Sequence, residues 1–141
     1  MSDYLQAISE SRAVIDALDA EREEKIQARN DRLLRLFASG VPTARLAAAT
    51  NMTESSVRKI ATLNGVRRAG VREVLAGDEV NLDWLRRLRT TVDGIDARIA
   101  AAHADRDAAV IAASREGTPQ TTIADVAGVG RSRISRIINE A

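Results

Sequence analysis

Apolar residues recur at helical spacing along two long stretches of the chain, and no stretch shows the alternation typical of a strand. In the later stretch the spacing is heptad-like, at Leu85, Leu88, Val92, Ile95, Ile99 and Ala102. The earlier stretch carries a rougher stripe, formed by Tyr4, Ile8, Ile15, Leu18 and Ile26. Such stripes stay exposed to water unless the helices cover each other. We therefore predict an all-α fold in which two long helices pack together.

Capping residues predict where these helices begin and end. Ser2 or Asp3 can cap a first helix that runs to about residue 39, and Asn81 can cap a second that runs to about residue 116. Gly94 is the expected point of any break in the second. After each helix a glycine can end the turn and a proline can open the next helix; these residues are Gly40, Pro42, Gly117 and Pro119.

The chain contains an internal repeat. Residues 4–61 align with residues 81–138 at an offset of 77 positions, without a gap. Identical pairs include Arg12/Arg89, Asp16/Asp93, Arg29/Arg106, Gly40/Gly117, Pro42/Pro119, Ala47/Ala124 and Ser55/Ser132. We interpret the chain as two homologous units, residues 1–65 and 81–141, joined by a linker over residues 66–80.

Each repeat ends in a segment typical of two short helices that cross at a steep angle. These segments are residues 43–62 and 120–139. A small side chain is needed where the helices cross, and the turn needs a residue tolerant of positive φ. Ala47 with Asn51, and Ala124 with Gly128, meet these needs. The apolar residues expected to bury the short helices are Leu46, Met52, Val57 and Ile60, and in the second repeat Ile123, Val129, Ile134 and Ile137.

These residues resemble the helix-turn-helix DNA-binding fold. The closest likeness is to the three-helix, homeodomain-like type at the C-terminus of Hin-type recombinases and in many bacterial and phage regulators. GVGRSRISRII in the second repeat is similar to that family's turn and recognition helix, and NMTESSVRKIA is a fainter copy with Asn51 in place of glycine and an acidic Glu54. The resemblance covers residues 28–63 and 105–139 and includes no catalytic domain. Two such units also resemble the bipartite DNA-binding regions of some transposases.

The resemblance implies that the helices beginning near Thr53 and Gly130 enter the major groove. Arginine can donate two hydrogen bonds to guanine, serine adapts to bases or phosphates, and glutamate can accept from cytosine. An exposed helix face can also be only solvated surface. The DNA-binding candidates are Thr53, Glu54, Ser55, Ser56, Arg58, Lys59, Arg131, Ser132, Arg133, Ser135 and Arg136.

The linker adds two further candidates, Arg67 and Arg68, in a basic segment flanked by Gly65 and Gly70. Such a segment can enter a minor groove, lie along phosphates or be ordinary linker. The stretch from Val71 to Val80 could form a short hairpin, although one strand pair is marginal on its own.

Charge is segregated along the chain although the net charge is only +1. Residues 31–74 carry eight basic and three acidic groups, whereas residues 1–30 carry four and seven. From Val126 to Asn139 there is no acidic residue at all. Since DNA affinity depends on phosphate neutralisation, this local charge favours DNA as the partner. The 19 arginines, against Lys25 and Lys59, are also typical of a GC-rich genome, of a bacterium, a phage or a mobile element.

Several classes of function are disfavoured. With no cysteine and one histidine, thiolate and multi-histidine metal sites are excluded, and His103 is interpreted as a surface or interhelix residue. Three aromatic residues are too few for a stacking platform. No nucleophile elbow or phosphate loop is present, so we expect no enzyme and no cofactor. No apolar run is long enough for a membrane span, and we expect a cytoplasmic, nucleoid-associated protein.

We therefore predict sequence-specific binding of double-stranded DNA, as a transcriptional regulator that acts as a repressor. The alternatives are a DNA-segregating or DNA-organising protein, a recombination accessory factor, and a helical protein-interaction adaptor. With two reading units in one chain, a monomer is expected to act as a covalent pseudo-dimer on two different half-sites. The heptad seam also leaves a homodimer through the long helices open.

Overall fold

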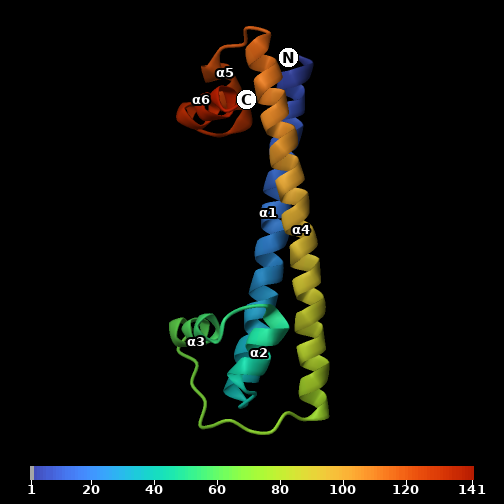
Figure 1. Ribbon diagram of the computed structural model, residues 1–141, viewed down its shortest axis with the longest axis vertical. Coiled ribbons are helices and arrows are strands. Elements are labelled where there is room, and N and C mark those ends of the chain that lie inside the picture. The colour runs from blue at the N-terminus through green and yellow to red at the C-terminus, as the bar shows by residue number, and fades with distance from the viewer. Residues whose placement is uncertain (1) are drawn as a thin grey trace. The chain divides into compact units, whose positions relative to one another are not determined.

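The computed structural model describes residues 2–141, and in that range every regular element is an α-helix. Two long helices, α1 (Asp3–Ala38) and α4 (Ala76–Arg115), are each followed by two short ones (Figure 1). The short helices are α2 (Thr43–Thr50) and α3 (Glu54–Leu63), then α5 (Gln120–Ala127) and α6 (Arg131–Asn139). The all-α fold predicted from the sequence is confirmed, and the order of elements follows the repeat.

Local capping contacts set the predicted ends of the long helices. The Leu5 N–H donates to Ser2 Oγ at 3.2 Å, so Ser2 is the cap of α1. Gly40 has a φ of +100°, and the Val41 N–H donates to the Leu36 carbonyl at 3.1 Å. The same left-handed turn follows α4 at Gly117, with a φ of +90°. Both glycines therefore end a helix as expected, because a side chain would strain that backbone.

The second long helix begins earlier than the sequence indicates, at Ala76 and not at Asn81. The Leu75 N–H donates to the Asp78 carboxylate at 2.9 Å, which satisfies a backbone donor at the start of α4. Residues 76–80 are thus the first turn of a helix and not part of a linker or hairpin. Gly94 does not break α4, which continues through it.

The helices pack as two compact units, and neither coincides with a sequence repeat. The continuous unit is Arg22–Gly94, and the split unit joins the chain up to Glu21 with Ile95–Ala141. In each unit, a segment of α1 and a segment of α4 lie side by side in opposite directions (Figure 1). Each short-helix pair therefore packs with parts of both long helices.

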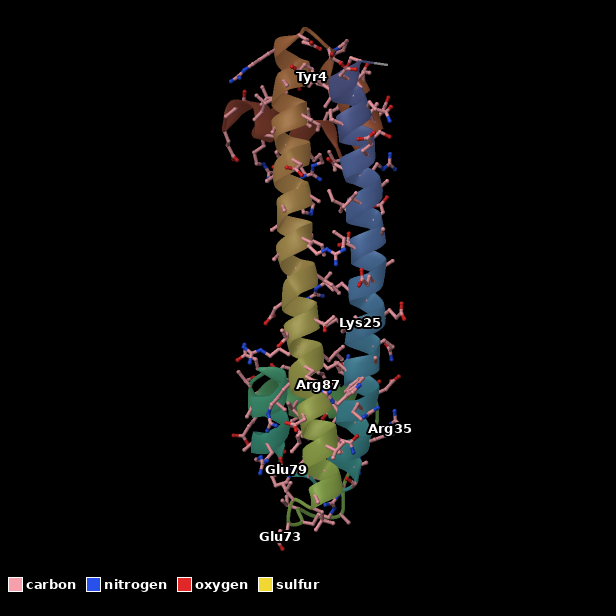
Figure 2. All side chains as sticks on the ribbon, turned by 90° about the vertical axis from the view of Figure 1, so that its right-hand side faces the viewer. Tyr4, Lys25, Arg35, Glu73, Glu79 and Arg87 are labelled. Carbon is pink, nitrogen blue, oxygen red and sulfur yellow. The ribbon has the colours of Figure 1, made fainter. Side chains whose placement is uncertain are left out.

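In the continuous unit, apolar residues of α1 and α4 form one core with α2 and α3. Leu33, Leu46, Val57, Leu82 and Leu85 are fully buried there. Trp84 packs against this core, and the Arg32 guanidinium lies 4.2 Å from its ring centroid. Charged residues of α1 such as Arg35 project away from α4 (Figure 2).

The split unit has an equivalent core in which Ile8 of α1 meets Val110 of α4, with Ile123 and Ile134 from the short helices. All four side chains are fully buried. Since Ile8 and Val110 are far apart in the sequence, this core depends on α4 returning along α1.

Candidate functional site

The first helix pair (α2–α3) and the second helix pair (α5–α6) are closed by the turn residues predicted from the sequence. Asn51 has a φ of 55° and Gly128 a φ of 70°, both in the left-handed region. Their N–H groups donate to the carbonyls of Ala47 and Ala124, the small residues expected at the helix crossings. The turns therefore hold the two short helices of each pair at a fixed angle.

Buried residues on one face fix the orientation of α3 and α6. Val57 in α3 and Ile134 in α6 are fully buried, and Ile60 and Ile137 are half-buried against the same cores. The opposite face of each helix is exposed and polar. The position of the buried face therefore decides which residues reach solvent.

Along α3, the predicted residues form local contacts with one another. Thr53 caps the helix by accepting from the Ser56 N–H at 3.1 Å. Glu54 and Arg58 form an exposed ion pair at 3.4 Å, one helical turn apart. Ser55 and Lys59 are exposed, and the Lys59 ammonium makes no hydrogen bond or ion pair with the described chain. The positive charge of Arg58 is thus partly neutralised within α3.

Along α6, the arginines are free of such neutralisation. Arg131, Arg133 and Arg136 are exposed, and their guanidinium groups make no hydrogen bond or ion pair within residues 2–141. Ser132 is exposed as well. Ser135 is half-buried, and its hydroxyl lies 2.8 Å from Gln120 Oε1. The surface of α6 therefore presents three guanidinium groups with unused donors.

The two linker candidates have different environments. Arg67 is exposed. Arg68 donates to the Val41 carbonyl at 2.6 Å and to Thr43 Oγ1 at 2.7 Å, and it lies 4.4 Å from the Phe37 ring centroid. The guanidinium of Arg68 thus holds the linker against α1 and α2.

Arg72 fixes the next part of the linker. It forms two hydrogen bonds to the buried Asp78 carboxylate, one of them 3.0 Å long, and donates to the Ser39 carbonyl at 2.7 Å. These hydrogen bonds, followed by the one from the Leu75 N–H, lower the pKa of Asp78 to about 2. They also raise the pKa of Arg72. Nothing in the local sequence pattern indicated this pair.

Arg12 was also missed, because its contact lies across the split unit. Its Nη1 lies 3.4 Å from the Asp125 carbonyl and 3.5 Å from the Val126 carbonyl. These carbonyls are near the C-terminus of α5, where a cation is favoured by the helix dipole. Arg12 thereby attaches α1 to the second helix pair.

No family model, curated protein or solved structure matches this chain. Within residues 2–141, no cluster of side chains is arranged to hold a metal ion. In the same part of the chain, no helix is both long and apolar enough to cross a bilayer.

Proposed function

We propose that this chain is a sequence-specific double-stranded DNA-binding protein that acts as a transcriptional regulator, without catalysis. The observation that carries the proposal is the exposed face of α6, where Arg131, Arg133 and Arg136 have no acceptor in the described chain. An arginine can donate two hydrogen bonds to a guanine edge or a phosphate. Double-stranded DNA supplies both kinds of acceptor along one groove.

The helix pairs support this proposal by their geometry. In the resemblance noted from the sequence, the second short helix enters the major groove and its N-terminal residues reach base edges. The exposed N-terminal half of α6 and its fixed buried face suit that role. Association with the nucleoid would follow from it.

The first helix pair supports a second, different half-site. At the position of Arg131 it has Glu54, and at the position of Arg133 it has Ser56. Since Glu54 also pairs with Arg58, α3 offers less free positive charge than α6. We propose that α3 reads its own half-site and contributes less of the phosphate attraction.

The exposed Arg67 remains a candidate for the minor groove or the phosphates, whereas Arg68 serves the fold in the arrangement described above. Roles in DNA segregation or recombination would use the same interface on other sites. A homodimer through the long helices would present four reading helices.

The decisive experiment measures binding of the full chain to random genomic fragments by mobility shift, over a series of salt concentrations. We expect affinity to fall steeply with salt, because phosphate contacts release counterions. The double variant Arg131→Ala/Arg133→Ala should bind more weakly, whereas Arg115→Ala, which removes an exposed charge outside both helix pairs, should bind as the wild type does. If no salt-dependent binding is seen, the helical adaptor becomes the better explanation.

A further inference from the structure

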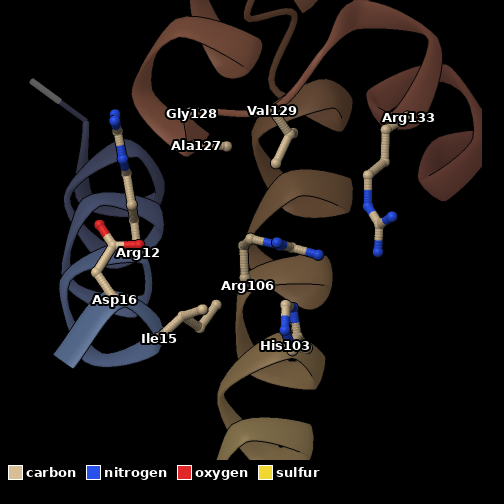
Figure 3. Close-up of a pocket in the computed structure, with 9 residues that line it drawn as sticks. All are labelled: Arg12, Ile15, Asp16, His103, Arg106, Ala127, Gly128, Val129 and Arg133. Carbon is tan, nitrogen blue, oxygen red and sulfur yellow. The ribbon is translucent and has the colours of Figure 1, made fainter. Parts of the chain in front are cut away.

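The split unit contains a cavity of about 340 Å³ that the sequence did not indicate. It lies between α1, α4 and the turn of the second helix pair, and three arginines line it: Arg12, Arg106 and Arg133 (Figure 3). His103 and Asp16 are also in its wall. Its size is in the range of natural sites for small molecules.

Arg106 is the unusual member of this wall, because it is a charged residue only 4% exposed. Its Nε and Nη2 donate to a single Asp107 carboxylate oxygen, at 3.2 and 3.1 Å. Its Nη1 makes no hydrogen bond within residues 2–141. Nη1 is nevertheless in contact with solvent, so it is free to donate to an acceptor that enters the cavity.

His103 adds a second unused polar atom. Its Nδ1 is buried and has no hydrogen-bond partner in the described chain. Arg133 of α6 lines the same cavity as Arg106 (Figure 3). Around the cavity, the guanidinium groups of Arg12, Arg106 and Arg133 outnumber the carboxylates of Asp16 and Asp107. The unused Nη1 donor of Arg106 and the excess of positive charge both favour an anion, and His103 can donate to it in the tautomer that carries the proton on Nδ1.

The internal repeat provides a natural comparison. At the offset of 77 positions, the continuous unit has Ile26 in place of His103 and Ser56 in place of Arg133. The residue aligned with Arg106 is Arg29, which is half-buried. Its guanidinium donates to the neutral side-chain amide oxygen of Asn30 at 3.1 and 2.9 Å. His103 and Arg133 are therefore specific to the split unit, whereas Arg106 has a counterpart in the continuous unit.

We propose that this cavity binds the phosphate group of a small phosphorylated molecule, with Arg106, Arg133 and His103 as the donors. Arginine is well suited to a phosphate because its parallel N–H groups match the oxygens. A phosphate bound in the cavity engages Arg133 and so lowers the affinity of the chain for DNA. This effect rests on the DNA-binding function proposed above. A DNA backbone phosphate offers the same chemistry, and the experiment separates the two sources.

Binding itself is tested without DNA. Inorganic phosphate and pyrophosphate are titrated into the full chain by calorimetry at constant ionic strength, with chloride as the balancing salt. We expect saturable binding that also raises the unfolding temperature. The variant His103→Ile/Arg133→Ser, which installs the residues of the continuous unit, should bind roughly tenfold more weakly or worse, as loss of charged hydrogen bonds predicts. Arg115→Ser should bind as the wild type does. Circular dichroism checks that each variant is folded.

The source of the phosphate is tested with His103→Ile alone. If small phosphorylated molecules occupy the cavity, this variant keeps its DNA affinity and loses only the inhibition by pyrophosphate. If the DNA backbone occupies it, the same variant binds DNA more weakly. Saturable phosphate binding without any DNA binding would refute the proposed function and leave the cavity site standing. Absence of saturable binding, or equal binding by the double variant, would overturn the cavity proposal.

Discussion

The guanidinium of Arg12 lies directly over Gly128. A Cβ atom built on Gly128 would be 2.5 Å from Arg12 Cζ, which is closer than real Cβ contacts allow. Gly128 therefore serves two needs at once: the left-handed turn between α5 and α6, and room for the arginine that attaches α1 to α5.

Replacing Gly128 by alanine should destabilise the chain by about 1–2 kcal/mol from the left-handed backbone alone. The displaced Arg12 should add a smaller loss, because its contacts to the Asp125 and Val126 carbonyls are exposed. Chemical denaturation measures the change. Gly94→Ala is the matched control, since Gly94 lies inside α4 with open space around it. That control should stabilise the chain by roughly 0.5–1 kcal/mol; equal effects at both glycines would contradict the role of Gly128.

The Arg72–Asp78 pair should make stability depend on acid pH. The pKa of Asp78 is about 2 in the folded chain and near 4 in an unfolded one. Because the folded pKa is depressed, its contribution is present above pH 4 and is lost as the pH falls towards 2. Asp78→Asn should therefore be less stable than the wild type at neutral pH, and the difference should shrink between pH 4 and 2. Urea denaturation across this range measures it, and a difference that does not change with pH would argue against the pair.

Replacing Arg131 or Arg133 by alanine should weaken binding to the cognate site by about 1–3 kcal/mol, if each arginine reads a guanine. The loss should be larger on the cognate site than on random DNA. Fluorescence anisotropy on both duplexes measures it. Equal losses on the two duplexes would mean that these residues contact phosphates only.

The full site should contain two different half-sites. Footprinting the full chain beside Arg58→Ala/Lys59→Ala and Arg131→Ala/Arg133→Ala should show each variant losing protection over its own half. Because the two units are linked, loss of either half should lower the affinity of the whole strongly. If both variants weaken the same short site, the bipartite interpretation is wrong. Isolated repeats are unsuitable for this test, because each would contain parts of both compact units.

Local sequence signals predicted the local structure well. The side chain of Ser2 caps a helix, as predicted. The residues predicted to adopt a positive φ at helix ends and turns do so: Gly40, Asn51, Gly117 and Gly128. Such signals work because they act within four or five residues along the chain. The heptad stripe of α4 likewise marks its buried face, where Val92 and Ile95 are buried.

Long-range contacts of arginine could not be predicted in this way. Arg68 looks like an exposed basic residue in the sequence, yet its guanidinium packs on Phe37. Arg12 finds acceptors more than a hundred positions away, and Arg106 is buried although its neighbours are alanines and aspartates. A long flexible side chain can reach several partners, so only the fold decides which one it meets. The cavity of the split unit was missed for this reason.

The insertion of the continuous unit into the split unit has a consequence for synthesis on the ribosome. All of Arg22–Gly94 emerges before any of Ile95–Ala141 does, and the chain up to Glu21 emerges before both. The side chains of Ile8, Ile15 and Leu18 therefore stay uncovered until Ile95–Ala141 is synthesised. The continuous unit is fully synthesised before then. Apolar surface exposed during this stage of synthesis favours association with other nascent chains. The N-terminal half of α1 is thus covered only after the later part of α4 is made, and a chaperone that shields it would act on residues 2–21.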